Sequence, residues 1–267
     1  PLPIHPWPGR PGFDCTGMRT NSLPHSRSWA EGLTVALLEE MTAAVQAIAQ
    51  TRWSTRRGQV VPDPEDLRLG NDAVEFDRAT VLYADLNGST NMVDTEAWQL
   101  SAEIYKAFLH CAATIIRKEG GKITSYDGDR VMGIWVGDRQ ATPAAKAGLK
   151  INYAVKMIVM PALKKQYPDW TGTVRHVVGI DSSPIRAART GIRGGNDIVW
   201  VGRAANHAAK LTDLDLAPST WITDEVFIRL ADELKYGGTP PTLMWEAFRW
   251  NRQGGRRIHG SDWAWRV

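Results

Sequence analysis

The chain has 267 residues, of which 43% are hydrophobic, so it can bury one large core. Its formal net charge of +3 suits an anionic ligand but falls short of the dense lysine and arginine stripe of a nucleic-acid-binding protein, and we expect no nucleic-acid partner. No run of about 18 apolar residues occurs, so the sequence predicts no membrane span.

The N-terminal part of the chain is rich in proline and predicts a flexible arm without the continuous apolar core of a signal peptide. Apolar residues then recur at helical spacing over 29–50, which predicts an amphipathic helix. Turn-forming and charged residues over 54–72 predict a connector. The chain therefore divides into an arm, a helix with its connector, and a main domain, at 1–28, 29–72 and 73–267.

Only two cysteines occur, Cys15 and Cys111, and they lie far apart in the sequence. Cys111 falls on the apolar side of a helical pattern. We therefore expect free thiols in a reducing compartment rather than a disulfide.

The main domain begins with a predicted strand at 79–86, ATVLYADL, followed by the loop NGST. Helical periodicity over 94–119 stops at two glycines. Two strand-like runs then flank Asp127-Gly128, a dipeptide typical of a tight hairpin turn. A second helix is predicted over 142–167.

The rest of the domain continues with β-rich sequence. Residues 173–192 predict a strand, a turn and a strand, residues 196–202 another strand, and residues 203–214 a third helix. A tryptophan-rich tail from Trp245 to Val267 predicts a closing hairpin that packs on the sheet. Because hairpins separate the helices, this order predicts an α+β fold and not a doubly wound sheet.

Two aspartates stand at the ends of strands that we expect to be neighbours. Asp85 lies at the end of the first strand, and Asp129 directly follows the hairpin turn. Close carboxylates repel each other unless a cation lies between them, and Mg²⁺ takes one or two carboxylates together with backbone oxygen, water and phosphate. The alternative is that each is an ordinary turn or cap residue, which we expect of Asp127.

Four segments carry a family resemblance: VLYADLNGSTNM, GGKITSYDGDRVMGIW, VVGIDSSP and VGRAANHAAKL. In order and spacing they resemble the signature segments of the class III nucleotidyl cyclase catalytic domain. The resemblance implies a palm-type, ferredoxin-like sheet with flanking helices, in a head-to-tail homodimer. It also implies two divalent metal ions, Mn²⁺ or Mg²⁺, on Asp85, Asp129 and the carbonyl of Leu86. Substrate phosphates would lie on the backbone amides of Asn87, Gly88, Ser89 and Thr90.

The same resemblance assigns two residues of the third helix to the active site of the partner subunit. Asn206 takes the place of the family's ribose-orienting asparagine, and Lys210 lies four residues further along the same helix face. Lys210 departs from the family's transition-state arginine, since it lacks the bidentate fork. His207 is expected to pack. The alternative for Asn206 and Lys210 is a solvated helix face in a degenerate domain that only binds nucleotide or a partner protein.

Within this family the chain is most similar to the bacterial Pycsar cyclases of antiphage defence, through VPDPEDLRLGNDAV and VLYADLNGSTNMVD. Those cytosolic homodimers make cyclic UMP or cyclic CMP, which is read by a separate effector with a cyclic-nucleotide-binding domain. The resemblance therefore implies a cytoplasmic pyrimidine cyclase and such an effector as a partner.

Base choice rests on two positions where purine cyclases carry Lys with Asp or Thr, or Glu with Cys. Here these positions hold Ser125 and Val199, so neither purine pair is present. A serine hydroxyl can donate to a uracil carbonyl or accept from a cytosine amine. Tyr126 and Trp200, next in sequence, either narrow the pocket or pack in the core. UTP is favoured by the resemblance, with CTP, ATP and GTP as alternatives.

Overall fold

The computed structural model describes residues 26–192 and 195–267. The predicted arm, up to residue 25, and Cys15 lie outside the described residues. The chain forms two units, Pro1–Thr51 and Arg52–Val267. In the first unit, α1 spans Ser26–Gln50 and confirms the predicted helix. None of the described helices is long and apolar enough to cross a membrane.

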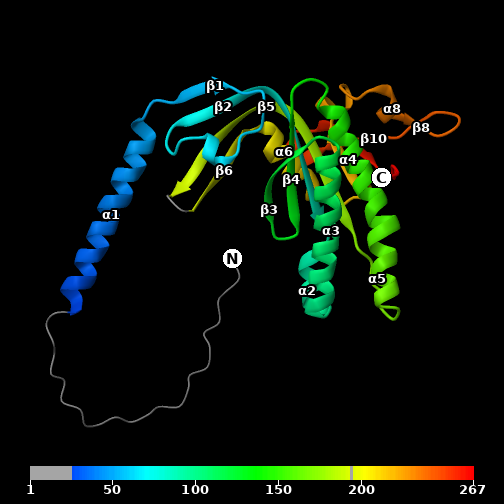
Figure 1. Ribbon diagram of the computed structural model, residues 1–267, viewed down its shortest axis with the longest axis horizontal. Coiled ribbons are helices and arrows are strands. Elements are labelled where there is room, and N and C mark those ends of the chain that lie inside the picture. Colours follow the sequence, from blue (N-terminus) through cyan, green and yellow to red (C-terminus); the bar gives the residue numbers. More distant parts are fainter. Residues whose placement is uncertain (1–25, 193–194) are drawn as a thin grey trace, which may run out of the picture. The chain divides into compact units, whose positions relative to one another are not determined.

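The second unit is built on a central sheet (Figure 1). Among the described residues, nine strands join it, in the order β10-β11-β7-β5-β2-β4-β3, with β1 beside β2 and β6 beside β5. Their bounds are β1 Ser54–Arg57, β2 Asp72–Leu86, β3 Lys122–Asp127, β4 Arg130–Val136, β5 His176–Ile192, β6 Gly195–Gly202, β7 Thr220–Thr223, β10 Glu246–Trp250 and β11 Arg256–Ser261. A separate pair consists of β8 Tyr236–Gly237 and β9 Thr242–Leu243.

The helices of this unit follow the predicted alternation with hairpins. Their bounds are α2 Ser89–Thr95, α3 Trp98–Lys118, α4 Ala141–Ala154, α5 Met160–Gln166, α6 Arg203–Thr212, α7 Asp224–Phe227 and α8 Asp232–Lys235. One π-helical turn, Val155–Val159, joins α4 to α5, so the predicted second helix is confirmed as one continuous helical run. Short 3₁₀ turns occur at Pro64–Asp66 and Asn251–Gln253.

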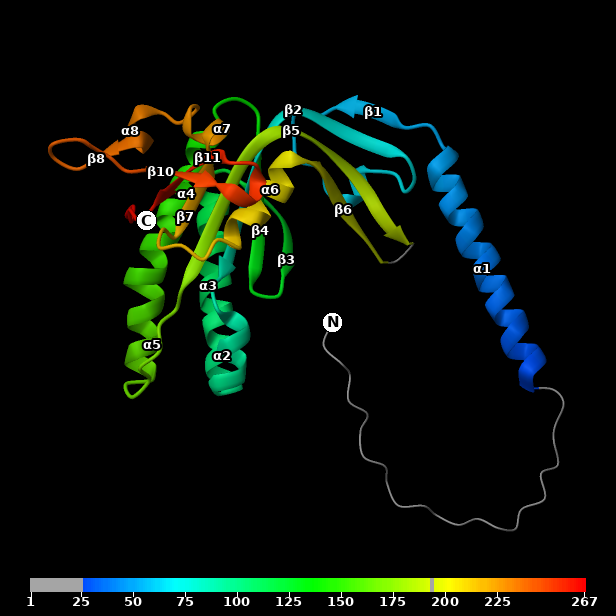
Figure 2. The same cartoon turned by 180° about the vertical axis from the view of Figure 1, so that it is seen from behind.

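Helices cover both faces of the sheet, with α3 and α4 on one face and α6 on the other (Figure 1, Figure 2). The period-two alternation of β2 explains this, because Leu82 packs against α3 and α4 while Val81 packs against α6. Helix α3 buries apolar side chains at three- and four-residue steps: Leu100, Ile104, Phe108, Ala112 and Ile115. Both faces of β2 are therefore buried along most of the strand.

Two predicted elements were wrong in detail. The predicted strand, turn and strand over 173–192 is a single strand, β5, because Pro184 lies where the pairing register with β2 shifts between Phe76 and Ala79. A proline is tolerated at such a bulge since no ladder hydrogen bond is required of it. The predicted helix 94–119 begins later, as α3 at Trp98, because Glu96 (ψ 158°) and Ala97 (ψ 139°) are extended. Asp94 and Thr95 instead end α2, which starts at Ser89 within the predicted loop.

The closing hairpin is confirmed, but it extends the sheet edge through the pairing of β11 with β7. The connector contributes β1, which pairs in parallel with β2. Cys111 is a free, half-buried thiol, and burial raises its pKa.

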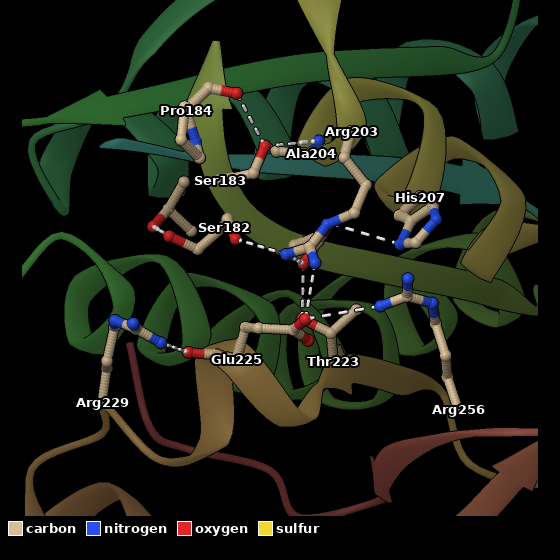
Figure 3. Close-up of polar contacts among 12 residues, drawn as sticks. Ser182, Ser183, Pro184, Arg203, Ala204, His207, Thr223, Glu225, Arg229 and Arg256 are labelled. Carbon is tan, nitrogen blue, oxygen red and sulfur yellow. Dashed lines mark hydrogen bonds and ion pairs between the residues drawn. The ribbon is translucent and has the colours of Figure 1, made fainter. Parts of the chain in front are cut away.

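A buried ion pair joins β5 to the first residue of α6. Asp181 is fully buried and accepts hydrogen bonds from Arg203, at 3.1 Å to Nε, and from the Thr223 hydroxyl at 2.6 Å. Arg203 also donates to the Glu225 carboxylate at 2.5 Å and to the Ser182 carbonyl at 2.8 Å (Figure 3). This network fixes where α6 begins against the sheet.

We predict that Asp181→Ala lowers the free energy of unfolding by about 3 kcal/mol, because it leaves the Arg203 guanidinium without its buried partner. Urea titration followed by circular dichroism measures this. Asp77→Ala is the matched control: Asp77 also pairs with an arginine, Arg57, at 3.1 Å, but the two side chains are 74% and 81% exposed. The control loss should stay below about 1 kcal/mol. Equal losses in the two variants would contradict the prediction.

Candidate active site

Asp85 lies at the end of β2 with its side chain half-buried. Its Oδ2 accepts two hydrogen bonds from Arg130, at 3.0 Å from Nε and 2.7 Å from Nη2. Burial raises the pKa of Asp85, Arg130 opposes that rise, and the negative charges of Asp129 and Asp213 add to it. The next residue, Leu86, is the last of β2 and pairs with His176.

Asp129 is held beside this carboxylate by the hairpin between β3 and β4. Gly128 supplies the left-handed conformation of the turn, with φ 60°. Strand β4 pairs with β2 through Val131 opposite Ala84, so the turn ends next to Asp85. The Oδ2 atom of Asp129 is buried and has no hydrogen-bond partner among the described residues. An unpartnered buried carboxylate oxygen next to a second carboxylate fits a divalent cation.

The described residues contain no group of three or more His, Cys, Asp or Glu side chains arranged for a metal ion. Two carboxylates are nevertheless a usual number of protein ligands for Mg²⁺, whose other ligands are water and substrate phosphates. The Arg130 guanidinium neutralises Asp85 in this structure, so it competes with a cation for the same carboxylate oxygen.

Arg130 and Tyr83 are site residues that the sequence reasoning missed. The Arg130 guanidinium lies 5.8 Å from the centre of the Tyr83 ring. Burial raises the pKa of Tyr83. Tyr83 precedes Asp85 by two residues, so the strand periodicity of two could have placed Tyr83 on the same face as the carboxylate. Arg130 directly follows Asp129 in the sequence.

The predicted phosphate loop starts α2. Gly88 adopts a left-handed conformation with φ 79°, and the backbone amides of Gly88, Ser89 and Thr90 have no hydrogen-bond partner among the described residues. Asn87 differs, because its amide donates to the carbonyl of Arg175 at 2.9 Å. Asn87, Gly88, Ser89 and Arg175 line one pocket of about 270 Å³. Arg175 is therefore the cation beside this loop, and no sequence motif had marked it.

The residues predicted to read the base lie far apart on the sheet. Ser125 on β3 stands opposite Met132 of β4. Val199 is a 43% exposed residue of β6. Strands β5, β2 and β4 separate β3 from β6, so Ser125 and Val199 do not meet within one chain. Tyr126 follows Ser125 and lines a groove along α3, on the other face of the hairpin. Its assignment to the base pocket stays a prediction, and this position weighs against it.

Asn206 and Lys210 project from the exposed face of α6. The opposite face of this helix buries Ala204, Ala208 and Leu211 against the sheet. Neither the Asn206 nor the Lys210 side chain has a hydrogen bond or ion pair to a described residue. His207, between them, is buried and packs edge-on against Trp250 at 5.2 Å, which confirms its predicted packing role.

No protein-family model matches the chain. Among curated proteins, a uridylate cyclase of Burkholderia cepacia is 50% identical over 234 residues, which cover 87% of this chain and 100% of that protein. A uridylate cyclase of Xanthomonas perforans is 46% identical over the same shares. A uridylate cyclase of Rhodovulum sp. is 34% identical over 221 residues, 81% of this chain and 92% of that protein.

Solved structures show the same fold at low sequence identity. The adenylyl cyclase CyaB from P. aeruginosa matches with a TM-score of 0.59 and 20% identity, over 71% of this chain and 95% of that one. The guanylyl cyclase Cya2 matches with a TM-score of 0.58 and 15% identity, over 70% and 93%. The fold is that of the class III cyclase domain, and the similarity to full-length curated relatives shows that the chain belongs to the family of uridylate cyclases.

Proposed function

We propose that the protein converts UTP to 3′,5′-cyclic UMP and pyrophosphate. The observation that carries this proposal is the 50% identity with a uridylate cyclase over that protein's whole length. The juxtaposed carboxylates of Asp85 and Asp129 support it, because they supply the ligand chemistry that a triphosphate with divalent cations needs. The product would act in the cytoplasm as a second messenger of antiphage defence, read by a separate cyclic-nucleotide-binding effector.

Different residues of the chain would have different roles in the reaction. Asp85, Asp129 and the Leu86 carbonyl would hold two Mn²⁺ or Mg²⁺ ions. When bound, such ions lower the pKa of the ribose 3′-hydroxyl and neutralise phosphate charge. The free amides at the start of α2 would orient the phosphates, with Arg175 as the nearby cation. No covalent enzyme intermediate is required.

The remaining residues would come from a second copy of the chain. Asn206 would orient the ribose, and Lys210 would stabilise the charge that develops on the α-phosphate. Their exposure on α6, without partners among the described residues, supports a role toward another subunit. The separation of Ser125 from Val199 supports it too, because the two strands lie apart in one chain and a head-to-tail homodimer would bring one copy's β3 to the other copy's β6.

Base choice is expected to favour pyrimidines. Neither Ser125 nor Val199 offers the paired polar groups that a purine edge needs, and unmet polar groups on a buried base cost about 1–3 kcal/mol each. The Ser125 hydroxyl serves a uracil carbonyl or a cytosine amine, so cytidylate cyclase activity is the second candidate.

We predict that the purified protein, given equal concentrations of UTP, CTP, ATP and GTP with Mn²⁺, makes cyclic UMP as its main product. Mass spectrometry of the cyclic products measures this. A main product of cyclic AMP or cyclic GMP would refute the pyrimidine assignment. Cyclic CMP would refute only the preference for UTP, and absence of any cyclic product or pyrophosphate would favour a degenerate domain.

Asp85→Asn and Asp129→Asn should each lower turnover by about 100-fold or more, because each removes a negative metal ligand with little change in volume. Pyrophosphate release measures turnover, and circular dichroism verifies the fold. Asp127→Asn is the matched control, since Asp127 lies in the same turn but is exposed. The turnover of the double variant Asp85→Asn/Asp129→Asn should be below about a tenth of the wild-type value. A higher turnover would show that the metal assignment is wrong.

A mixture of two inactive variants tests the shared site. Asp85→Asn and Lys210→Ala, mixed after subunit exchange, should regain about a quarter of wild-type activity, because half of the dimers are then mixed and each has one intact site. Asp85→Asn mixed with Asp129→Asn is the control and should stay inactive, because both changes fall in the same half of the site. A first mixture as inactive as its parents, despite demonstrated exchange, would contradict the arrangement.

A further inference from the structure

A second pocket lies away from the carboxylate pair. Its volume is about 340 Å³, and Arg78, Arg139, Arg229 and Gln140 line it together with Gly137, Asp138 and Ala141. Arg78 precedes Asp85 by seven residues on the same strand, which places the two about 20 Å apart. The pocket is therefore separate from the candidate active site.

The three arginines of this pocket are not neutralised by carboxylates. The side chains of Arg78 and Arg139 have no hydrogen bond or ion pair with a described residue. The side chain of Arg229 donates only to the backbone carbonyl of Glu225, at 2.5 Å (Figure 3). Burial, followed by repulsion from Arg229 and Arg203, lowers the pKa of Arg78, and the more weakly acting carboxylates of Asp181 and Glu225 oppose this shift only in part. The three arginines thus line one pocket without a carboxylate of the described residues in direct contact with their guanidinium groups.

One carboxylate, Asp138, also lines the pocket, but it is exposed and makes no ion pair with the described arginines. Three guanidinium groups against one carboxylate leave the pocket with a net positive charge. An anionic ligand would relieve the repulsion among these arginines, because like charges repel most strongly where water is partly excluded.

Two further donors point to the same ligand chemistry. The pocket contains the N-terminus of α4, a 14-residue helix with no acidic residue in its first turn. Gln140, which precedes that helix, is only 6% exposed, and its side-chain amide has no hydrogen-bond partner among the described residues. An oxyanion in the pocket would accept from the Gln140 side-chain amide and from the backbone amide of Ala141, the first residue of α4, which has no hydrogen-bond partner among the described residues.

We propose that this pocket binds a phosphate-bearing small molecule, with its phosphate held by Arg78, Arg139 and Arg229 and by the Gln140 amide. Guanidinium forks match the oxygens of a phosphate, and each such bond is charge-assisted. The volume of the pocket accepts a phosphate with a small organic group attached. The site does not depend on the cyclase reaction, and its test needs no turnover.

Calorimetric titration of the full chain with inorganic phosphate, and separately with UMP, tests the proposal. EDTA is present to exclude metal-dependent binding at the carboxylate pair, and the ionic strength is constant. We expect saturable binding that weakens by about tenfold or more in Arg78→Gln and in Arg139→Gln. Arg249→Gln on β10 is the matched control, because Arg249 is also exposed and unpaired among the described residues. Tighter binding of UMP than of phosphate would identify an organic ligand, and equal binding would identify phosphate itself.

Two results would overturn the proposal: no binding up to about 10 mM of either probe, or equal affinity in the wild type, Arg78→Gln and Arg139→Gln. Arg139 lies in an exposed loop, so its variant stays informative if Arg78→Gln fails to fold. Crystals soaked in tungstate, which replaces phosphate, locate the site directly. An anomalous peak among the three guanidinium groups is expected, and a peak only at the start of α2 would contradict the assignment.

Discussion

The pairing of β2 with β4 on one side and with β5 on the other is the constraint on which the candidate site depends. It places Asp85 next to the turn that ends at Asp129, and it does so with both faces of β2 buried. Two carboxylates in that position repel each other, and burial adds to the cost of their charge. Arg130 offsets part of this cost by binding Asp85 directly. The sheet therefore holds the two carboxylates close together despite their mutual repulsion, and this repulsion favours the binding of a cation between them.

Local sequence signals were sufficient for much of this arrangement. The hairpin at Asp127-Gly128 is found where the dipeptide predicts it, because the turn geometry requires a left-handed residue that glycine supplies at little cost. The sequence pattern predicted both α3 and α6 as helices. Asp85 and Asp129 could be placed as neighbours because the hairpin that ends at Asp129 was expected to pair beside the strand of Asp85, and strands that follow one another in sequence usually lie together in a sheet.

What the sequence did not reveal depends on contacts between distant residues. Arg130 and Asp85 are 45 residues apart, and Arg203 and Asp181 are 22 apart, so no periodicity links either pair. The continuous β5 was missed for a similar reason: Pro184 signals a turn locally, and only the bulge in the neighbouring strand accommodates it. The same limit applies to base choice, because Ser125 and Val199 belong to strands that one chain keeps apart.

The surroundings of the arginines distinguish their roles better than their sequence context does. Arg203 pairs with the buried Asp181. Removal of the Arg203 side chain would leave the Asp181 carboxylate buried without this cation, which costs free energy of folding. Arg130 binds Asp85, whose side chain keeps 16% exposure, so a divalent cation can displace the Arg130 guanidinium without disrupting the core. Arg78 and Arg139 have no carboxylate partner at all among the described residues. An arginine that folding leaves unpaired in a concave site can bind an anion from solution. In this respect the arginines of the pocket at α4 differ from Arg130 and Arg203, whose ion pairs stabilise the sheet and the position of α6.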